Sequence, residues 1–248
     1  MDGTTHRRVA LPFPDRPAAG RLLGTRLRDD GLAGGPDAWG DGPGGGPDAG
    51  GNLPALVLAL PRGGVAVAAE VARILGAPLD VLVTRKIGYP PQPELGLGAI
   101  AEGGEPVYDH GRLAAIGLEP ADLRATAERE RAELARRVRV YRGGQPPPDV
   151  TGRLVVLVDD GVATGVTARA ALRAIRARGA ARTILAVPVG PPGTARHMKR
   201  EADEVVVLAS PAGFRSVGEW YVTFGQLTDA DVLWLLAQAH AQSPRRGP

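Results

Sequence analysis

The chain has 248 residues, of which 44% are hydrophobic and only 4% aromatic, with a formal net charge of +3 and no cysteine. The missing cysteines exclude disulfides, cysteine nucleophiles and cysteine metal sites, and a basic excess this small gives no reason to expect nucleic acid as a partner. A core of Ala, Val and Leu is typical of a parallel sheet covered by helices, so we expect an α/β fold.

No apolar stretch approaches the roughly 20 residues that cross a membrane, and the polar first residues do not lead into the apolar region of a signal peptide. We therefore expect a cytoplasmic protein without a membrane partner, a compartment with which the lack of cysteine agrees. We predict a single domain over residues 1–241 and a flexible tail over residues 242–248.

The first predicted element in chain order is a helix over Asp15–Asp30, with Asp15 as its N-cap. Gly31–Asn52 follows with ten glycines and little to bury, which predicts a disordered insertion within the domain.

A strand over Ala55–Leu60, a helix over Val65–Gly76 and a strand over Leu79–Thr84 come next, by their hydrophobic patterns. This βαβ order implies a pair of parallel strands. Residues 88–96 carry three prolines and two glycines, and we predict a loop without regular structure there.

The second half of the chain begins with a predicted amphipathic helix over Glu119–Tyr141. Strands and helices then alternate to the end: strand Leu154–Val158, helix Val166–Arg178, strand Thr183–Val187, helix Thr194–Glu201, strand Glu204–Leu208 and helix Asp229–His240. The alternation predicts a doubly wound, mostly parallel central sheet flanked by helices.

The segment Val155–Thr167 carries the strongest chemical signal in the sequence. Its apolar strand ends in Asp159 and Asp160, at the place where open α/β sheets bind ligands. Two carboxylates there can accept hydrogen bonds from a sugar diol, directly or through a divalent ion. The turn after them leads into a helix whose free N–H groups and dipole suit a phosphate. The segment therefore predicts a ribose 5-phosphate site.

This strand, acid pair and Ala-Thr-Gly-x-Thr loop resemble the type I phosphoribosyltransferase family, and in particular a bacterial group with Leu-Pro-Arg-Gly-Gly and Val-Asp-Asp-Gly-x-Ala-Thr-Gly segments. The resemblance implies the family's fold, a central sheet with a small hood region. It implies that Asp159 and Asp160 hold the ribose and, indirectly, Mg²⁺. It also implies a loop that binds the 5′-phosphate, formed by Gly161, Val162, Ala163, Thr164, Gly165, Val166 and Thr167. Val166 stands where the family commonly has a second glycine.

Three further segments match the family pattern. Pro61, Arg62, Gly63 and Gly64 resemble its diphosphate loop; a plain tight turn is the alternative. The pair formed by Arg85 and Lys86 resembles the basic residues of its mobile lid, and Trp220 or Phe214 would stack on a base unless they pack in the core.

By resemblance, the protein transfers the phosphoribosyl group of phosphoribosyl diphosphate to a nitrogen nucleophile, with Mg²⁺ as cofactor. Ala163 occupies the position where enzymes acting on 6-oxopurines carry an aspartate, which disfavours hypoxanthine and guanine as acceptors. Glu94 and Glu102 are candidates for an acid or base, and a surface role is the alternative for each. The alternatives are a regulator that binds phosphoribosyl diphosphate without turnover and a related hydrolase or phosphorylase; a homodimer is left open.

Overall fold

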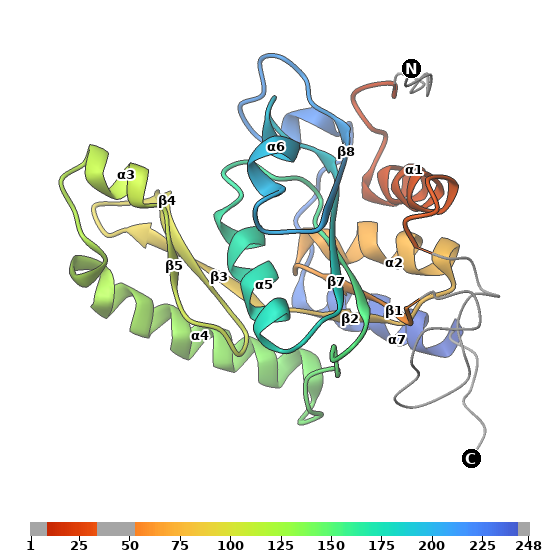
Figure 1. Ribbon diagram of the computed structural model, residues 1–248, viewed down its shortest axis with the longest axis horizontal. Coiled ribbons are helices and arrows are strands. Elements are labelled where there is room, and N and C mark those ends of the chain that lie inside the picture. Colours follow the sequence, from red (N-terminus) through yellow and green to blue (C-terminus); the bar gives the residue numbers. More distant parts are fainter. Residues whose placement is uncertain (1–8, 34–52, 243–248) are drawn as a thin grey trace.

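The computed structural model describes residues 9–33 and 53–242, and its centre is a five-stranded parallel sheet (Figure 1). The sheet runs in the order β2-β1-β6-β7-β8. Its strands are β1 (Ala55–Ala59), β2 (Leu79–Val81), β6 (Leu154–Val158), β7 (Arg182–Val189) and β8 (Glu204–Ala209). Every residue of β1 and β6 is buried, as expected for strands covered on both faces. The predicted mostly parallel α/β fold is confirmed.

Helices cover both faces of the sheet. One face packs against α1 (Arg16–Asp29), α2 (Gly63–Leu75) and α7 (Asp229–Gln242), and the other against α5 (Val166–Ala177) and α6 (Thr194–Met198). Successive side chains of a strand alternate between these two clusters: Val57 and Val156 lie in the first, and Leu58 and Leu157 in the second.

A second unit, which we call the hood, stands beside the parallel sheet (Figure 1). It consists of a three-stranded antiparallel sheet and the helices that follow it. Its elements are β3 (Thr84–Tyr89), β4 (Gln92–Ala101), β5 (Val107–Tyr108), α3 (His110–Ala115), the 3-10 helix η2 (Pro120–Leu123) and α4 (Arg124–Arg142).

The loop predicted for residues 88–96 is wrong, because β3 and β4 form a hairpin there. Pro90 and Pro91 lie in the turn, and Pro93 lies where β4 has one neighbour only, beside a register shift at Gly88. A proline without an N–H is compatible with such irregular, one-sided pairing.

Other boundaries also differ from the prediction. The strand predicted over Leu79–Thr84 is split: β2 ends at Val81, and Thr84 already belongs to the hood sheet. The helix predicted from Glu119 begins as the 3-10 helix η2, and the sequence patterns did not indicate β5 or α3.

The hood is joined to the parallel sheet by a buried group of charges around Arg142, the last residue of α4. Its guanidinium bonds Glu102 through Nε (2.8 Å) and Nη2 (3.0 Å), Asp80 through Nη1 (3.0 Å) and the carbonyl of Val81 (2.7 Å). Glu102 was a candidate for acid-base chemistry, but its carboxylate is engaged in this group.

The helix ends follow the sequence closely. Asp15 caps α1 by accepting a hydrogen bond from the N–H of Ala18 (2.7 Å), as predicted, and Thr228 accepts one from Asp231 at the start of α7 (3.2 Å). The Gly-rich insertion lies outside the described residues except for residues 31–33, and residues 243–248 of the tail lie outside them too. No helix in the described part of the chain could cross a membrane.

Candidate functional site

The carboxyl ends of β1 and β6 lie side by side, with Ala59 opposite Val158. From β1 the chain continues to β2 on one side, whereas β6 continues to β7 and β8 on the other. The reversal of strand order falls between β1 and β6, and it is at such a point that open α/β sheets form their ligand crevices. Both of the strongest sequence motifs, Leu60–Gly64 and Asp159–Thr167, start there.

The two acids after β6 have different surroundings. Asp159 lines a cavity of about 200 Å³, and its Oδ1 accepts a hydrogen bond from the N–H of Asp160 (2.8 Å). Burial raises the pKa of the Asp159 carboxyl well above its usual range, and the neighbouring charge of Asp160 raises this pKa further. Asp160 does not line the cavity, so the geometry separates two residues that the sequence treats alike.

Asp160 is held by Arg16 and Tyr221, and Phe224 packs against Arg16 in turn. Nε of Arg16 bonds Oδ2 of Asp160 (2.8 Å), and the hydroxyl of Tyr221 donates to the backbone carbonyl of Asp160 (2.6 Å). The Arg16 guanidinium also lies over the ring of Phe224, 3.8 Å from its centroid, and bonds the carbonyl of Gly225 (2.8 Å). Asp160 is therefore fixed as a support for the loop.

Glycines let the loop after β1 approach these acids. A Cβ on Gly63 would lie 1.9 Å from Oδ2 of Asp160, and one on Gly64 would lie 2.9 Å from the carbonyl oxygen of Val158. The peptide bond before them, between Pro61 and Arg62, is cis. The Leu-Pro-Arg-Gly-Gly segment is therefore packed directly on the acid pair, with no space for a larger residue.

The predicted phosphate loop ends at Gly165, which is the N-cap of α5 and has a φ of 75°, a conformation that favours glycine. Gly165 has no side chain to cap α5, and the N–H of Val166 makes only a long hydrogen bond to Oγ1 of Thr164 (3.4 Å). The first N–H groups of a helix have no partner within it. Val166 is buried against the hood residues Ala99 and Ala101. Val166 therefore joins the start of α5 to the hood in one buried cluster.

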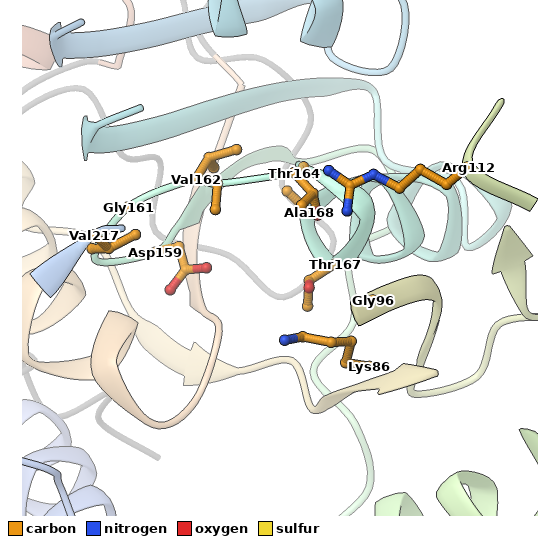
Figure 2. A pocket seen from close by; sticks show the side chains of 12 residues that line it. Lys86, Gly96, Arg112, Asp159, Gly161, Val162, Thr164, Thr167, Ala168 and Val217 are labelled. Carbon is orange, nitrogen blue, oxygen red and sulfur yellow. The ribbon is translucent and has the colours of Figure 1, made fainter. Parts of the chain in front are cut away.

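The cavity brings together the predicted phosphate loop and two cations of the hood (Figure 2). From the hood, Lys86 of β3, Gly96 of β4 and Arg112 of α3 line it; the remaining lining residues are Asp159, Gly161, Val162, Ala163, Thr164, Gly165, Thr167, Ala168 and Val217. Carboxylate, ammonium, guanidinium and hydroxyl groups thus converge on one space of the size of a small polar ligand.

Several predicted residues lie elsewhere. Arg85 is next to Lys86 in β3, so its side chain points to the opposite face of the strand, where its Nε bonds Oε2 of Glu130 (2.7 Å). Arg62 is the N-cap residue of α2 and does not line the cavity. Pro61, Gly63, Gly64 and Val166 are also absent from the lining, although Gly63 and Gly64 contact the acids.

The predicted aromatic residues pack in a cluster beside the site. Trp220 and Phe214 both pack against a buried cluster that includes Phe13, and within the described residues the buried indole N–H of Trp220 has no hydrogen-bond partner. Neither aromatic lines the cavity, whereas Val217 of the same segment does.

The sequence did not point to Arg16, Arg112 or Tyr221. Arg16 and Asp160 are 144 residues apart, and no spacing rule connects them. Tyr221 lies in the Gly218–Phe224 segment that the prediction covered, but the prediction singled out Trp220 as the aromatic for a base.

A magnesium ion would need ligands beyond the protein. Within residues 9–33 and 53–242, no three His, Cys, Asp or Glu side chains gather closely enough to hold a metal ion. Asp159 presents one carboxylate to the cavity, which fits an ion that keeps several waters and takes its other ligands from a substrate.

Comparison with known proteins gives consistent matches. A family model described as "Phosphoribosyl transferase domain" matches residues 48–214. Proteins of two Mycobacterium tuberculosis strains, H37Rv and CDC 1551 / Oshkosh, both named "Putative phosphoribosyl transferase", are each 43% identical over 235 residues, 95% of this chain and 48% of theirs. The chain thus spans about half the length of these curated relatives. The crystal structure of TT1426 from Thermus thermophilus is 41% identical, covers 91% of this chain and 98% of its own, and superposes with a TM-score of 0.68.

Proposed function

This chain belongs to the phosphoribosyl transferase domain family, and on that premise we propose that it transfers the 5-phosphoribosyl group of phosphoribosyl diphosphate to a nitrogen nucleophile. The acceptor would be a nucleobase or a related heterocycle. In this reaction the bond from ribose C1 to the diphosphate oxygen breaks and a bond from C1 to nitrogen forms. Diphosphate leaves with the electron pair, and the nitrogen proton passes to solvent.

The observation that carries the proposal is the shared cavity of Asp159 and the start of α5. A 5-phosphoribosyl group has a hydroxyl pair at one end and a dianionic phosphate at the other. The Asp159 carboxylate can accept from the hydroxyls, while Thr164, Gly165 and Thr167 offer hydroxyl and N–H groups to the phosphate.

The same arrangement suits the charge that develops during transfer. Positive charge builds on ribose C1 and the ring oxygen as diphosphate departs, and the ionised Asp159 carboxylate stabilises it electrostatically. Lys86 reaches the cavity from the hood and is placed to pair with the departing diphosphate. A magnesium ion held by Asp159 and substrate oxygens would further neutralise the diphosphate.

Ala163 of the lining offers no carboxylate to an acceptor. A hydrogen-bonding partner for a 6-oxopurine ring is therefore lacking at this position of the loop. We expect acceptors other than hypoxanthine and guanine to be preferred.

The test is to incubate the protein with phosphoribosyl diphosphate, Mg²⁺ and a panel of nucleobases and related heterocycles, and to follow diphosphate release. We expect release with at least one acceptor, and Asp159→Asn should slow it on the order of a hundredfold, the loss that removal of one electrostatic group from an active site can cause. Asp29→Asn is the matched control, since the Asp29 side chain is 60% exposed at the end of α1.

Two results would count against this function. Tight binding of phosphoribosyl diphosphate without release for any acceptor would support the regulator. No binding at all would remove the assignment of the cavity to a phosphoribosyl group.

A further inference from the structure

Arg112 is a cavity residue that neither the sequence motifs nor the family resemblance indicates. It lies on α3 of the hood, yet it lines the same space as Thr164 and Thr167 of the loop before α5. Figure 2 shows its guanidinium end extending toward Thr164. A cation from the hood thus faces the N–H and hydroxyl groups expected to receive a phosphate.

The surroundings of Arg112 leave its outer nitrogens available. Asp109 caps α3 by accepting from the backbone N–H of Arg112 (3.1 Å), and its other carboxylate oxygen lies 3.4 Å from Nε of the same residue. In the part of the chain that the structure describes, Asp109 is the one ion-pair partner of Arg112. The side chain is 42% exposed, so the two terminal NH₂ groups can form the paired hydrogen bonds that suit a phosphate.

The loop itself carries no positive side chain between Gly161 and Thr167. Backbone N–H groups and the helix dipole supply only partial charges, whereas a phosphate monoester carries close to two negative charges at neutral pH. Lys86 and Arg112 are the cations that line the cavity, and Figure 2 shows Arg112 as the one beside Thr164, with Lys86 across the cavity.

Packing keeps the hood close to this loop. Val166, the first residue of α5, lies in one buried cluster with Ala99 and Ala101 of β4. The antiparallel pairing of Gly98 with Tyr108 leads from β4 toward α3. The position of α3 relative to the loop is therefore supported by a buried contact rather than by surface charges alone.

We propose that Arg112 binds the 5′-phosphate from the hood side, so that one phosphate group is held between the start of α5 and α3. This inference rests on the proposed function, and it assigns to the hood a role in selecting 5-phosphorylated sugars. A guanidinium at this position could also receive a carboxylate of the acceptor, and the experiment separates these two sources of negative charge.

The experiment compares wild type, Arg112→Ala and Arg112→Lys by calorimetry with ribose 5-phosphate, ribose, inorganic diphosphate and a carboxylated pyrimidine as probes. Loss of charge-assisted hydrogen bonds should weaken ribose 5-phosphate binding about tenfold to hundredfold in Arg112→Ala. Arg112→Lys should recover part of it, because lysine restores the charge without the paired geometry. Diphosphate affinity should stay unchanged. Arg124→Ala is the matched control, since Arg124 is exposed in the same hood and does not line the cavity.

The possible outcomes distinguish a failure of the Arg112 proposal from a failure of the proposed function. If wild type does not bind ribose 5-phosphate, the proposed function fails, whatever the variants do. If wild type binds it and Arg112→Ala binds it equally well, the role of Arg112 is overturned while the proposed function stands. The role is also overturned if only the carboxylated pyrimidine loses affinity. A melting temperature equal to that of wild type would show that a loss of affinity is local.

Discussion

The half of the cavity formed by the parallel sheet and the half formed by the hood are built in different ways. In the sheet half, Gly64 packs against Asp159, and Asp160, beside the cavity, is bonded to Arg16 and in contact with Gly63, so close contacts fix the backbone there. In the hood half, Lys86 and Arg112 extend from β3 and α3 on long, partly exposed side chains. The sheet half defines the shape of the cavity and contributes the Asp159 carboxylate, and the hood half supplies the cationic groups.

This difference predicts that the two halves respond differently to substitutions. Adding a single atom should disrupt the sheet half, because close packing leaves no room for it. Removing a whole side chain should be tolerated structurally in the hood half, where the loss is one of electrostatic attraction. Substitutions can therefore test whether the two halves really differ.

Gly63→Ala should have the largest effect. Its Cβ would lie 1.9 Å from the Asp160 carboxylate, so Asp160 must move away and break its ion pair with Arg16. Overpacking and the loss of a buried pair each cost on the order of 1–3 kcal/mol or more. We expect ribose 5-phosphate affinity to fall at least about a hundredfold, as measured by calorimetry, together with a lower melting temperature.

Gly225→Ala is the control for this change. A Cβ there meets nothing within 4 Å, and the carbonyl that binds Arg16 is retained. If Gly63→Ala bound ribose 5-phosphate as wild type does, the tight contact between the two loops would not determine the site.

The sheet half was also the half that the sequence predicted best. The strand Leu154–Val158, the acids after it and the helix that begins at Val166 were all located correctly, because apolar runs and glycines are local signals. The hood hairpin was missed because the prediction relied on the three prolines of residues 88–96. In the folded chain, β3 and β4 pair in spite of these prolines. Local propensity cannot report how a strand will be paired.

Contacts between residues far apart in the chain could not be predicted from the sequence for the same reason. Arg16 contacts Asp160, and Arg112 lines the same cavity as Thr164, only once the chain is folded. A helix-start arginine such as Arg16 has no sequence feature that distinguishes it from a solvated one.

Lys86→Ala should have the second-largest effect, compared with Arg85→Ala on the same strand. Lys86 lines the cavity, while Arg85 bonds Glu130 on the opposite face. Losing a charge-assisted contact should weaken inorganic diphosphate binding about tenfold to hundredfold in Lys86→Ala. Arg85→Ala removes the same charge and should change this affinity by less than about threefold. The partly exposed ion pair of Arg85 with Glu130 lies outside the cavity. Losing it should affect stability rather than binding, by about 0–1 kcal/mol.

This pair of variants tests whether the face of β3 on which a basic side chain lies decides its role in diphosphate binding. Titration calorimetry with diphosphate and Mg²⁺ gives both affinities. Equal losses in the two variants would mean that the net charge of the hood matters and the direction of the side chain does not.

Asp160→Asn should have the smallest effect on affinity, because asparagine adds no bulk and keeps a hydrogen bond to Arg16. Its effect should appear as a shift in pH dependence. The Asp159 carboxyl must be ionised to stabilise a cation-like sugar or hold Mg²⁺, and burial together with the charge of Asp160 raises its pKa. Affinity for ribose 5-phosphate with Mg²⁺ should therefore be lost as pH falls through this raised pKa. Asparagine removes the neighbouring charge but can still accept from Arg16, so the pKa of Asp159 should fall and the loss of affinity should move to lower pH.

Folding stability gives an independent readout of the same group. Because the pKa of Asp159 is higher in the folded chain than in the unfolded chain, the folded state binds more protons between the two values, and stability decreases as pH rises through that window. Asp160→Asn should flatten this decrease in the melting temperature, whereas Asp29→Asn should leave it unchanged. A pH profile identical to wild type in both binding and melting would mean that Asp160 supports the loop through Arg16 without influencing the charge of Asp159.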